Sequence, residues 1–300
     1  MISQHEELSG LIRVLRYYAF FHYAATFDDI YISYPYSVSK TQLESILRTA
    51  HTEGRVLTEK IAGISYYTLP SHGITLHVVV SKIEATERKL ERVAPFLFFA
   101  KYFPTVSLIG LSGSLAMENT GKNDDVDYFV ISKPGRVWTT RFLLLILASL
   151  LGMRRRRGER SPSGKVCLNL FFDGSDLTVP EQKQNLYVAH EIVQMKPVFE
   201  RGKIYERFLE ANSWINEYFP NFRGQERSNV VIPAKAGIHL NRSPIGVGDD
   251  KKYPSSILEK LARSVQLYWM RGHITNELVS DSQMWFYPDD FEKKIKSMLS

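Results

Sequence analysis

The segment 106–132 restricts what this chain can fold into more than any other. It reads VSLIGLSGSLAMENTGKNDDVDYFVIS: an apolar run ends in the pair Gly113 and Ser114, and ten residues later a second apolar run begins around Asp125 and Asp127. Side chains two positions apart on a strand point to the same side. We therefore expect both carboxylates to converge at one strand end, beside a turn whose backbone N–H groups face an anion.

Paired carboxylates bind Mg²⁺, and Mg²⁺ accompanies nucleoside triphosphates. The order strand, Gly-Ser, spacer, Asp-x-Asp resembles the signature of the DNA polymerase β-type nucleotidyltransferase superfamily. By this resemblance, Gly113 and Ser114 hold the terminal phosphates, while Asp125 and Asp127 hold Mg²⁺, with Mn²⁺ as the alternative metal. Read from the residues alone, the alternative is a surface β-turn followed by two solvated acids.

The superfamily places a third carboxylate on the neighbouring strand, which here reads KVCLNLFFD at 165–173. Asn169 aligns with that position, so the resemblance gives Asp125, Asp127 and Asn169 as the catalytic set. An asparagine carbonyl ligates Mg²⁺ but supplies no negative charge and accepts no proton as a base. This departure leaves open whether catalysis is retained.

Several other polar groups are candidates for this site. Lys133 and Arg141 are expected to touch the phosphates of the nucleotide, with solvated charges as the alternative. His190 and Glu191 begin a pattern like that of zinc proteases, but Gln194 stands where the second histidine is needed. We therefore expect this pair to pack and hydrogen bond beneath the site rather than to bind zinc.

The first seventy residues predict three helices followed by a hairpin, which is the outline of a winged helix. Thr26 with Asp29 and Ser39 with Gln42 have the spacing of helix N-terminal caps. Two strands, 55–58 and 64–69, are expected around Ala62-Gly63. The third helix exposes charges of both signs, and its acids would repel phosphates. The pattern therefore favours docking to a protein or domain over DNA binding.

The expected fold class is α+β: an N-terminal winged helix, a polymerase β-like α/β core and a C-terminal helical part. Pro95 is expected to bend a linker helix over 86–102. Further helices are expected at 136–153, 181–195, 202–218 and 255–278. The domain boundaries that we infer are 1–72 for the winged helix, 73–105 for the linker helix, 106–200 for the core, and 201–300 for the helical region with an inserted loop at about 228–250.

The composition of the chain bears on its cellular compartment and on its partners. A single cysteine, Cys167, excludes an internal disulfide and fits a reducing cytoplasm. The longest apolar run, 142–151, spans only about 15–18 Å as a helix, against ~30 Å of hydrocarbon, so no membrane partner is expected. The net charge of +6 favours anionic ligands, and part of it lies in RRRRGER at 154–160, either a solvated loop or a phosphate-gripping one.

The chain as a whole is similar to a family of bacterial proteins that fuse a winged helix to a nucleotidyltransferase domain. The resemblance covers roughly 10–227 and, more weakly, 251–300, and is carried by segments such as RYYAFFHYAATFDDI, LSGSLAM, DVDYFVISKPGRVWTTR and VCLNLFF. It implies transfer of a nucleoside monophosphate from a nucleoside triphosphate to an unknown acceptor, which is a small molecule, a protein or an RNA. The alternatives are a catalytically impaired nucleotide-binding regulator and a winged-helix DNA-binding protein.

Overall fold

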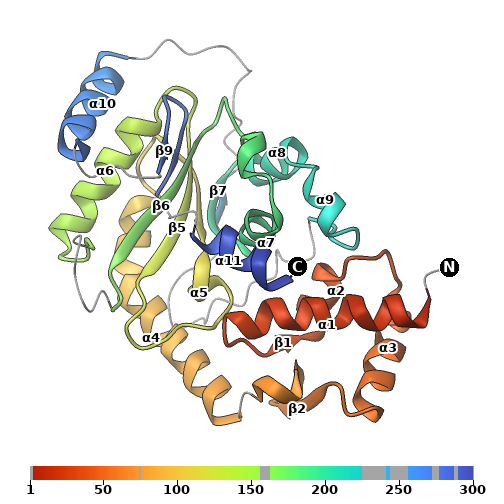
Figure 1. Cartoon of the computed structure of the whole chain (residues 1–300). Helices are drawn as coiled ribbons and strands as arrows, with labels where there is room; N and C mark the ends of the chain where they lie inside the picture. Colours follow the sequence, from red (N-terminus) through yellow and green to blue (C-terminus); the bar gives the residue numbers. More distant parts are fainter. Residues whose placement is uncertain are drawn as a thin grey trace.

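The fold is a mixed α+β arrangement of two sheets and the helices that cover them (Figure 1). The computed structural model describes residues 3–73, 76–155, 163–224, 241–243, 256–271, 277–286 and 290–299. Within this part of the chain, the larger sheet has the strand order β8-β7-β4-β5-β6-β10-β9 and the smaller one the order β1-β3-β2. None of the helices described is long and apolar enough to span a bilayer.

The N-terminal unit contains the expected three helices and hairpin. Its elements are α1 (Gln4–Phe20), β1 (Ala25–Thr26), α2 (Phe27–Ser33), α3 (Lys40–Thr52), β2 (Leu57–Ile61) and β3 (Ile64–Thr68). The caps at Thr26 and Ser39 are confirmed: each side chain accepts a backbone N–H three residues on, and the residue at that position reaches back to the cap. The helices bury Leu11, Ile30 and Leu43 in a hydrophobic core that Ile295, near the end of the chain, also joins.

The hairpin differs slightly from the expected one. Its first strand begins at Leu57 rather than at Arg55, because the N–H groups of Arg55 and Val56 both donate to Ala50 O and close the end of α3. The turn lies at Ala62 and Gly63, as expected, and both residues have positive φ values, +49° and +87°. Two left-handed residues match the twist of a tight hairpin.

A long helix, α4 (Leu76–Ala100), joins this unit to the larger sheet. It begins ten residues before the expected start and contains Pro95. Its second half is buried against the sheet through residues such as Val93 and Phe96, and its first half lies beside the N-terminal unit, where Lys82 Nζ donates to His22 O. The helix therefore contacts both parts of the molecule.

The centre of the larger sheet is formed by β4 (Val106–Leu111), β5 (Val126–Ser132) and β6 (Val166–Asp173), with α5 (Gly113–Ala116) after β4 and α6 (Val137–Leu150) between β5 and β6. β4 pairs antiparallel with β5, and β5 pairs parallel with β6 across the expected helical crossover. Val126 and Tyr128 face the apolar layer of α4 and α6, and Phe129 and Ile131 face the opposite layer, which contains α7.

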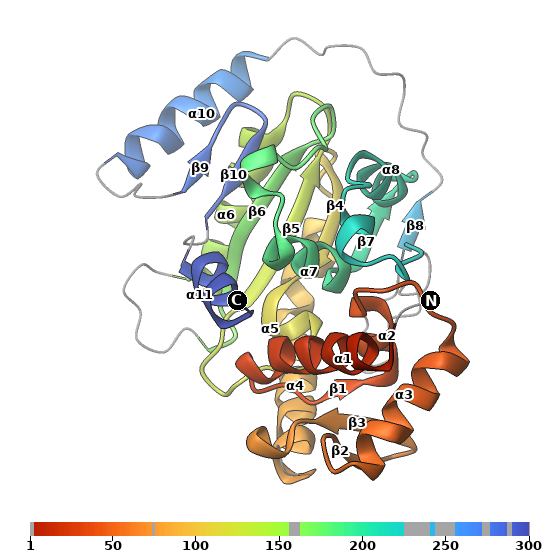
Figure 2. The same ribbon diagram turned by 45° about the vertical axis from the view of Figure 1, so that its right-hand side comes forward.

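The C-terminal part departs from the expected helical region because it contributes strands to the sheet (Figure 2). The predicted core ends with α7 (Leu186–Gln194) and β7 (Lys196–Arg201), and the region that follows contains α8 (Ile204–Ala211), α9 (Ile215–Tyr218), β8 (Asn241–Ser243), α10 (Ile257–Met270), β9 (Leu278–Val279), β10 (Gln283–Trp285) and α11 (Asp290–Leu299). Short 3₁₀ turns occupy Pro70–His72 and Glu181–Lys183. β10 pairs antiparallel with β6 and with β9, so these two strands extend the sheet rather than belong to a separate bundle.

Buried side chains explain why the expected helices are shorter. Asn185 caps α7 by accepting Val188 N–H, so that helix starts later than Glu181. The expected helix 202–218 breaks at Asn212, whose side chain bonds Val179 N–H and the carbonyls of Leu177 and Phe208. The expected loop at 228–250 lies outside the described residues except for β8, which pairs parallel with β7.

Candidate functional site

The Gly-Ser pair and the second aspartate meet at one edge of the larger sheet. Gly113 has φ +60°, and a β-carbon built on it would lie 2.6 Å from Asp127 Oδ2. The preceding residue, Ser112, donates its N–H to Asp127 O at 3.0 Å. Since any side chain at position 113 would collide with the carboxylate, this turn accepts only glycine without rearrangement. The expected neighbourhood of turn and carboxylate is present.

Three side chains form a compact group at this edge: Asp125, Asp127 and Cys167 each offer one ligand atom, and these atoms lie within 4.8 Å of one another. Parallel pairing sets Asp127 directly opposite Cys167. The cysteine was not among the expected site residues, although it stands two positions before Asn169 and therefore on the same side of a regular strand. The alternation of side chains along β6 is the signal that could have identified it.

Asn169 joins the group through an irregularity in β6. Leu168 pairs with Tyr128 and Leu170 with Phe129, so Asn169 is an extra residue in the strand. Such bulges redirect side chains. Here Asn169 Nδ2 donates to Asp127 Oδ1, and Asn169 Oδ1 accepts from Cys167 Sγ at 2.8 Å. The third position is thus occupied by a neutral hydrogen-bonding group.

The site is crowded with negative charge. Burial raises the pKa of Asp127 to about 8, and the charges of Asp125 and Glu191 add to that rise. Burial also raises the pKa of Glu191 to about 7. Arg155 opposes the effect on Asp127 and forms an ion pair with Asp125 Oδ2 at 2.5 Å. A bound cation would reduce the electrostatic repulsion between carboxylates held together in this way.

The chemistry of the donor atoms selects among metals. Burial raises the pKa of the Cys167 thiol far above its usual range, and the charges of Asp127 and Asp125 add to this. Without a metal, the thiol is therefore protonated at neutral pH, and the remaining donors of the group are carboxylate and amide oxygens. Mg²⁺ and Mn²⁺ prefer oxygen donors of this kind, whereas a thiolate ligand would require Cys167 to lose its proton.

Lys89, on α4, supports the loop that leads into Asp125. Its Nζ donates to Gly121 O at 2.5 Å and to Asp124 O at 2.7 Å. Burial lowers the pKa of Lys89, while the charges of Asp124, Asp125 and Asp127 counter that effect. Lys89 was not singled out from the sequence, because it belongs to an ordinary amphipathic helix. Arg155 belongs to the arginine run 154–160, for which a phosphate-gripping loop was one of the two alternatives, and the fold places this residue beside Asp125.

His190 has the packing role expected for it. Its ring stacks on Tyr17 at 3.5 Å between centroids and meets Phe219 edge-on at 4.6 Å, and the side chain is buried. The neighbouring Glu191 does more than pack, because its charge acts on Asp127. The sequence placed Glu191 beneath the site but gave no sign of this electrostatic coupling.

The structure does not bring Lys133 or Arg141 to the carboxylates. Lys133 follows the far end of β5, six residues beyond Asp127, a distance of about 20 Å along a strand. Arg141 lies on α6, on the other face of the sheet, where it donates to Gln266 Oε1 at 2.7 Å and its guanidinium lies 4.4 Å from the centre of the Phe286 ring. Burial lowers the pKa of Arg141 to about 10, and Arg154 adds to this.

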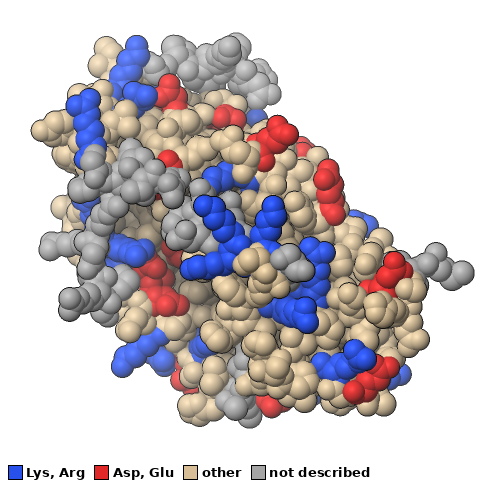
Figure 3. All heavy atoms as spheres, in the orientation of Figure 1, with Lys and Arg blue, Asp and Glu red and all other residues tan. Residues whose placement is uncertain are grey.

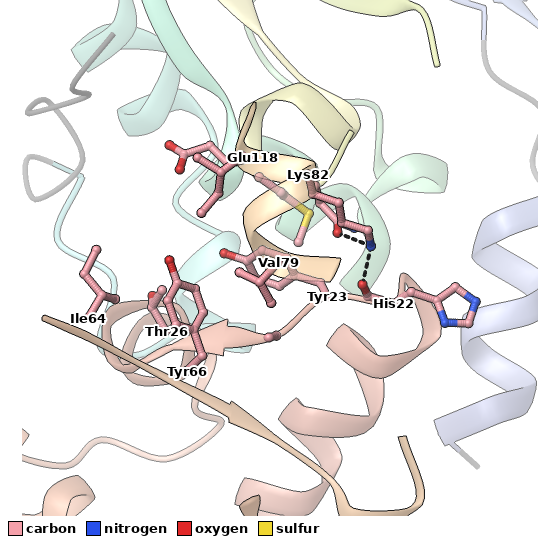
Figure 4. A pocket seen from close by; sticks show the side chains of 12 residues that line it. His22, Tyr23, Thr26, Ile64, Tyr66, Val79, Lys82 and Glu118 are labelled. Carbon is pink, nitrogen blue, oxygen red and sulfur yellow. Dashed lines mark hydrogen bonds between the residues drawn. The ribbon is translucent and has the colours of Figure 1, made fainter. Parts of the chain in front are cut away.

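A hollow of about 100 Å³ separates the N-terminal unit from the segment that follows α5 (Figure 4). Lys82 crosses it, donating to His22 O at 2.5 Å and to Asn119 Oδ1 at 2.6 Å. Asn119 in turn donates its backbone N–H to Ser114 O at 2.9 Å. The first unit is therefore connected by hydrogen bonds to the Gly-Ser turn.

The five arginines of 154–160 are described only at Arg154 and Arg155; the remainder lies outside the described residues.

Comparison of the chain with protein-family models, curated proteins and solved structures found no match. The case for a function therefore depends on the site itself. In this α+β protein, two carboxylates, an asparagine and a glycine turn lie together at one edge of the sheet.

Proposed function

We propose that the chain is a Mg²⁺-dependent nucleotidyltransferase, which transfers a nucleoside monophosphate from a nucleoside triphosphate to an acceptor. The observation that carries this proposal is the contact between the Gly113 turn and Asp127, with Asp125 beside them. A turn of backbone N–H groups next to paired carboxylates suits a triphosphate and its metal together.

Asp125 and Asp127 are the residues that would hold the metal, with the Asn169 carbonyl as a neutral addition. When bound, Mg²⁺ would neutralise phosphate charge and activate the attacking hydroxyl. Arg155 pairs with Asp125, and a metal ion bound to Asp125 would release the guanidinium as a counter-charge for phosphate. Mn²⁺ fits the same oxygen ligands.

The protein's own contribution is positioning and proton transfer. The backbone at Gly113 and Ser114 would hold the phosphates that leave as pyrophosphate. The acceptor oxygen forms a bond to the α-phosphorus as the α–β anhydride bond breaks, and the acceptor's proton passes to a carboxylate. Asn169 has no place for that proton and Asp127 is engaged with the metal, so the role falls to Glu191, whose pKa of about 7 suits a general base near neutral pH.

We also assign the N-terminal unit to the winged-helix class. The order α1-β1-α2-α3-β2-β3 and the sheet order β1-β3-β2 support the assignment. Asn221 argues for docking: its amide donates to the carbonyls of Tyr31 and Tyr36 and its Oδ1 accepts Val38 N–H, joining the start of α3 to the rest of the chain. On α3, Lys40 pairs with Asp28 at 3.7 Å, which reduces the positive charge available for DNA.

A second candidate function is nucleotide binding without turnover. It is favoured by Asn169, which donates a hydrogen bond to Asp127 where a carboxylate would add charge. Under this alternative the site binds a triphosphate and reports its presence, and no pyrophosphate is formed.

Incubation with labelled nucleoside triphosphates, Mg²⁺ and an acceptor pool separates the two functions. A transferase releases pyrophosphate, and both Asp125→Asn and Asp127→Asn abolish the release. Glu59→Gln, an exposed change on the hairpin, is the control and leaves it unchanged. Triphosphate binding with no pyrophosphate from any pool supports the second function, and absence of binding contradicts both.

A further inference from the structure

We infer that a basic surface on α1 and α11 binds a single-stranded nucleic acid through its phosphate backbone. The surface, which we call the α1–α11 surface, consists of Arg13, Arg16, Lys293, Lys294 and Lys296, all of them exposed. The further step, that this strand is the acceptor, rests on the proposed transferase function. The binding itself does not.

Packing fixes the two helices side by side. Ile295 of α11 is 2% exposed and belongs to the core of the N-terminal unit. The ring of Phe291 lies 6.1 Å from that of Phe21, directly after α1. Figure 3 shows Lys and Arg side chains gathered on this face, over the place where Figure 1 draws α11 and α1. Two elements from opposite ends of the sequence thus build one positive area.

Among the described side chains, no ion pair neutralises the charges of this area. None of the five side chains lies within 4.0 Å of a carboxylate in the described part of the chain, whereas Lys40, Lys196 and Arg263 elsewhere each have an acidic partner. Five cations with no acidic partner in the described part of the chain, on adjacent helices, form the electrostatic footprint of a polyanion site.

An aromatic ring among these cations favours a single strand. Phe291 is 38% exposed, and Lys294 Nζ lies 5.6 Å from the centre of its ring. Proteins that bind single strands combine cations along the backbone with rings on which bases stack. A membrane-surface helix instead needs a broad apolar face directed outward. The apolar Ile295 of α11 is directed inward, so a nucleic acid is the better match.

The α1–α11 surface borders the carboxylate site. Phe291 stacks on Tyr187 at 5.9 Å between centroids, and α11 packs on α7. A hydrogen bond from Tyr187 reaches Glu191, whose charge acts on Asp127. A strand bound across α11 therefore passes close to the place where an acceptor end would react.

The experiment measures fluorescence anisotropy of labelled oligouridine and oligothymidine, about 12 nucleotides long, on the full chain without nucleotide or metal. Five phosphate contacts predict a slope of about −3.5 for log affinity against log salt, or about a 100-fold loss between about 50 and 200 mM salt. The triple variant Lys293→Glu, Lys294→Glu, Lys296→Glu is expected to lose at least about 10-fold in affinity and to reduce the slope by about 2.

Two further variants keep the outcome decisive. Arg13→Glu with Arg16→Glu tests the surface independently should the triple variant unfold, and Lys40→Glu with Arg48→Glu on α3 is the matched control, expected to bind as the unaltered chain does. No binding at low salt, loss only in the α3 variant, or preference for vesicles of anionic lipid would each overturn the inference. Asp127→Asn must retain full binding, so a failure of the transferase proposal leaves this result unaffected.

Discussion

Gly113 lies against Asp127 so closely that a β-carbon on the glycine would come within 2.6 Å of the carboxylate, although fourteen positions separate the two residues in sequence. This contact brings the turn after β4 to the start of β5. Position 113 therefore requires glycine for two reasons: the backbone has a positive φ there, and Asp127 leaves no room for a side chain.

Gly113→Ala should reduce both stability and nucleotide binding. The left-handed φ of +60° and the collision with Asp127 both oppose a side chain, and together they are expected to cost about 2–3 kcal/mol of unfolding free energy. Gly54→Ala is the matched control, because Gly54 has φ +68° with open space around it. Urea unfolding and triphosphate titration are the measurements. Equal binding by both variants would refute the role of the turn.

The stability of the metal-free protein should fall as pH rises from about 4 to 8. Because burial raises the pKa of Asp127 from 3.8 to about 8, the native state holds a proton in this window that the unfolded state has released. The loss is at most about 1.4 kcal/mol per pH unit for this group. Asp127→Asn should flatten the dependence, leaving the smaller contribution of Glu191. Urea unfolding at several pH values, with a chelator present, measures the free energy of unfolding. If Asp127→Asn leaves its dependence on pH unchanged, the raised pKa does not belong to Asp127.

Asn169→Asp should tighten Mg²⁺ binding about tenfold by adding a third negative charge, and should lower the stability of the metal-free protein through repulsion with Asp127. The same replacement at Asn216, exposed on α9, is the control for a change in net charge. Calorimetric titration with Mg²⁺ reports the affinity. A variant with weaker binding would show that Asn169 does not face the metal.

Lys89→Met should lower the unfolding free energy by about 1–3 kcal/mol, because two partly buried carbonyls lose their charged donor. Mg²⁺ affinity should fall as well, since the loop before Asp125 is no longer fixed. Lys60→Met, on an exposed position of β2, provides the comparison. If stability falls and metal binding does not, Lys89 supports the fold alone.

Local chemistry made much of the fold predictable. The capping boxes at Thr26 and Ser39 depend on residues three apart, and the β5-α6-β6 crossover follows from two apolar strands around one apolar helix. The strands β9 and β10 were missed because they are two and three residues long and depend on pairing with β6 and with each other. No local pattern of that length identifies a strand.

In the candidate site, too, some residues could be predicted from the sequence and others could not. Asp125, Asp127 and Gly113 were predicted together because adjacent strands set their positions. Lys133 and Arg141 were expected nearby on sequence distance alone, but β5 carries Lys133 to the opposite edge and α6 carries Arg141 to the other face. The contributions of Lys89 and Glu191 arise only from tertiary packing, whereas Arg155 belongs to the arginine run that the sequence had already offered as a candidate for phosphate binding.

Calorimetric titration of nucleoside triphosphates in the presence of Mg²⁺ tests the central claim most directly. The account predicts saturable binding that requires the metal and is lost in both Asp127→Asn and Gly113→Ala, while Gly54→Ala binds normally. Absence of metal-dependent binding for every triphosphate, or full binding by Asp127→Asn, would contradict it.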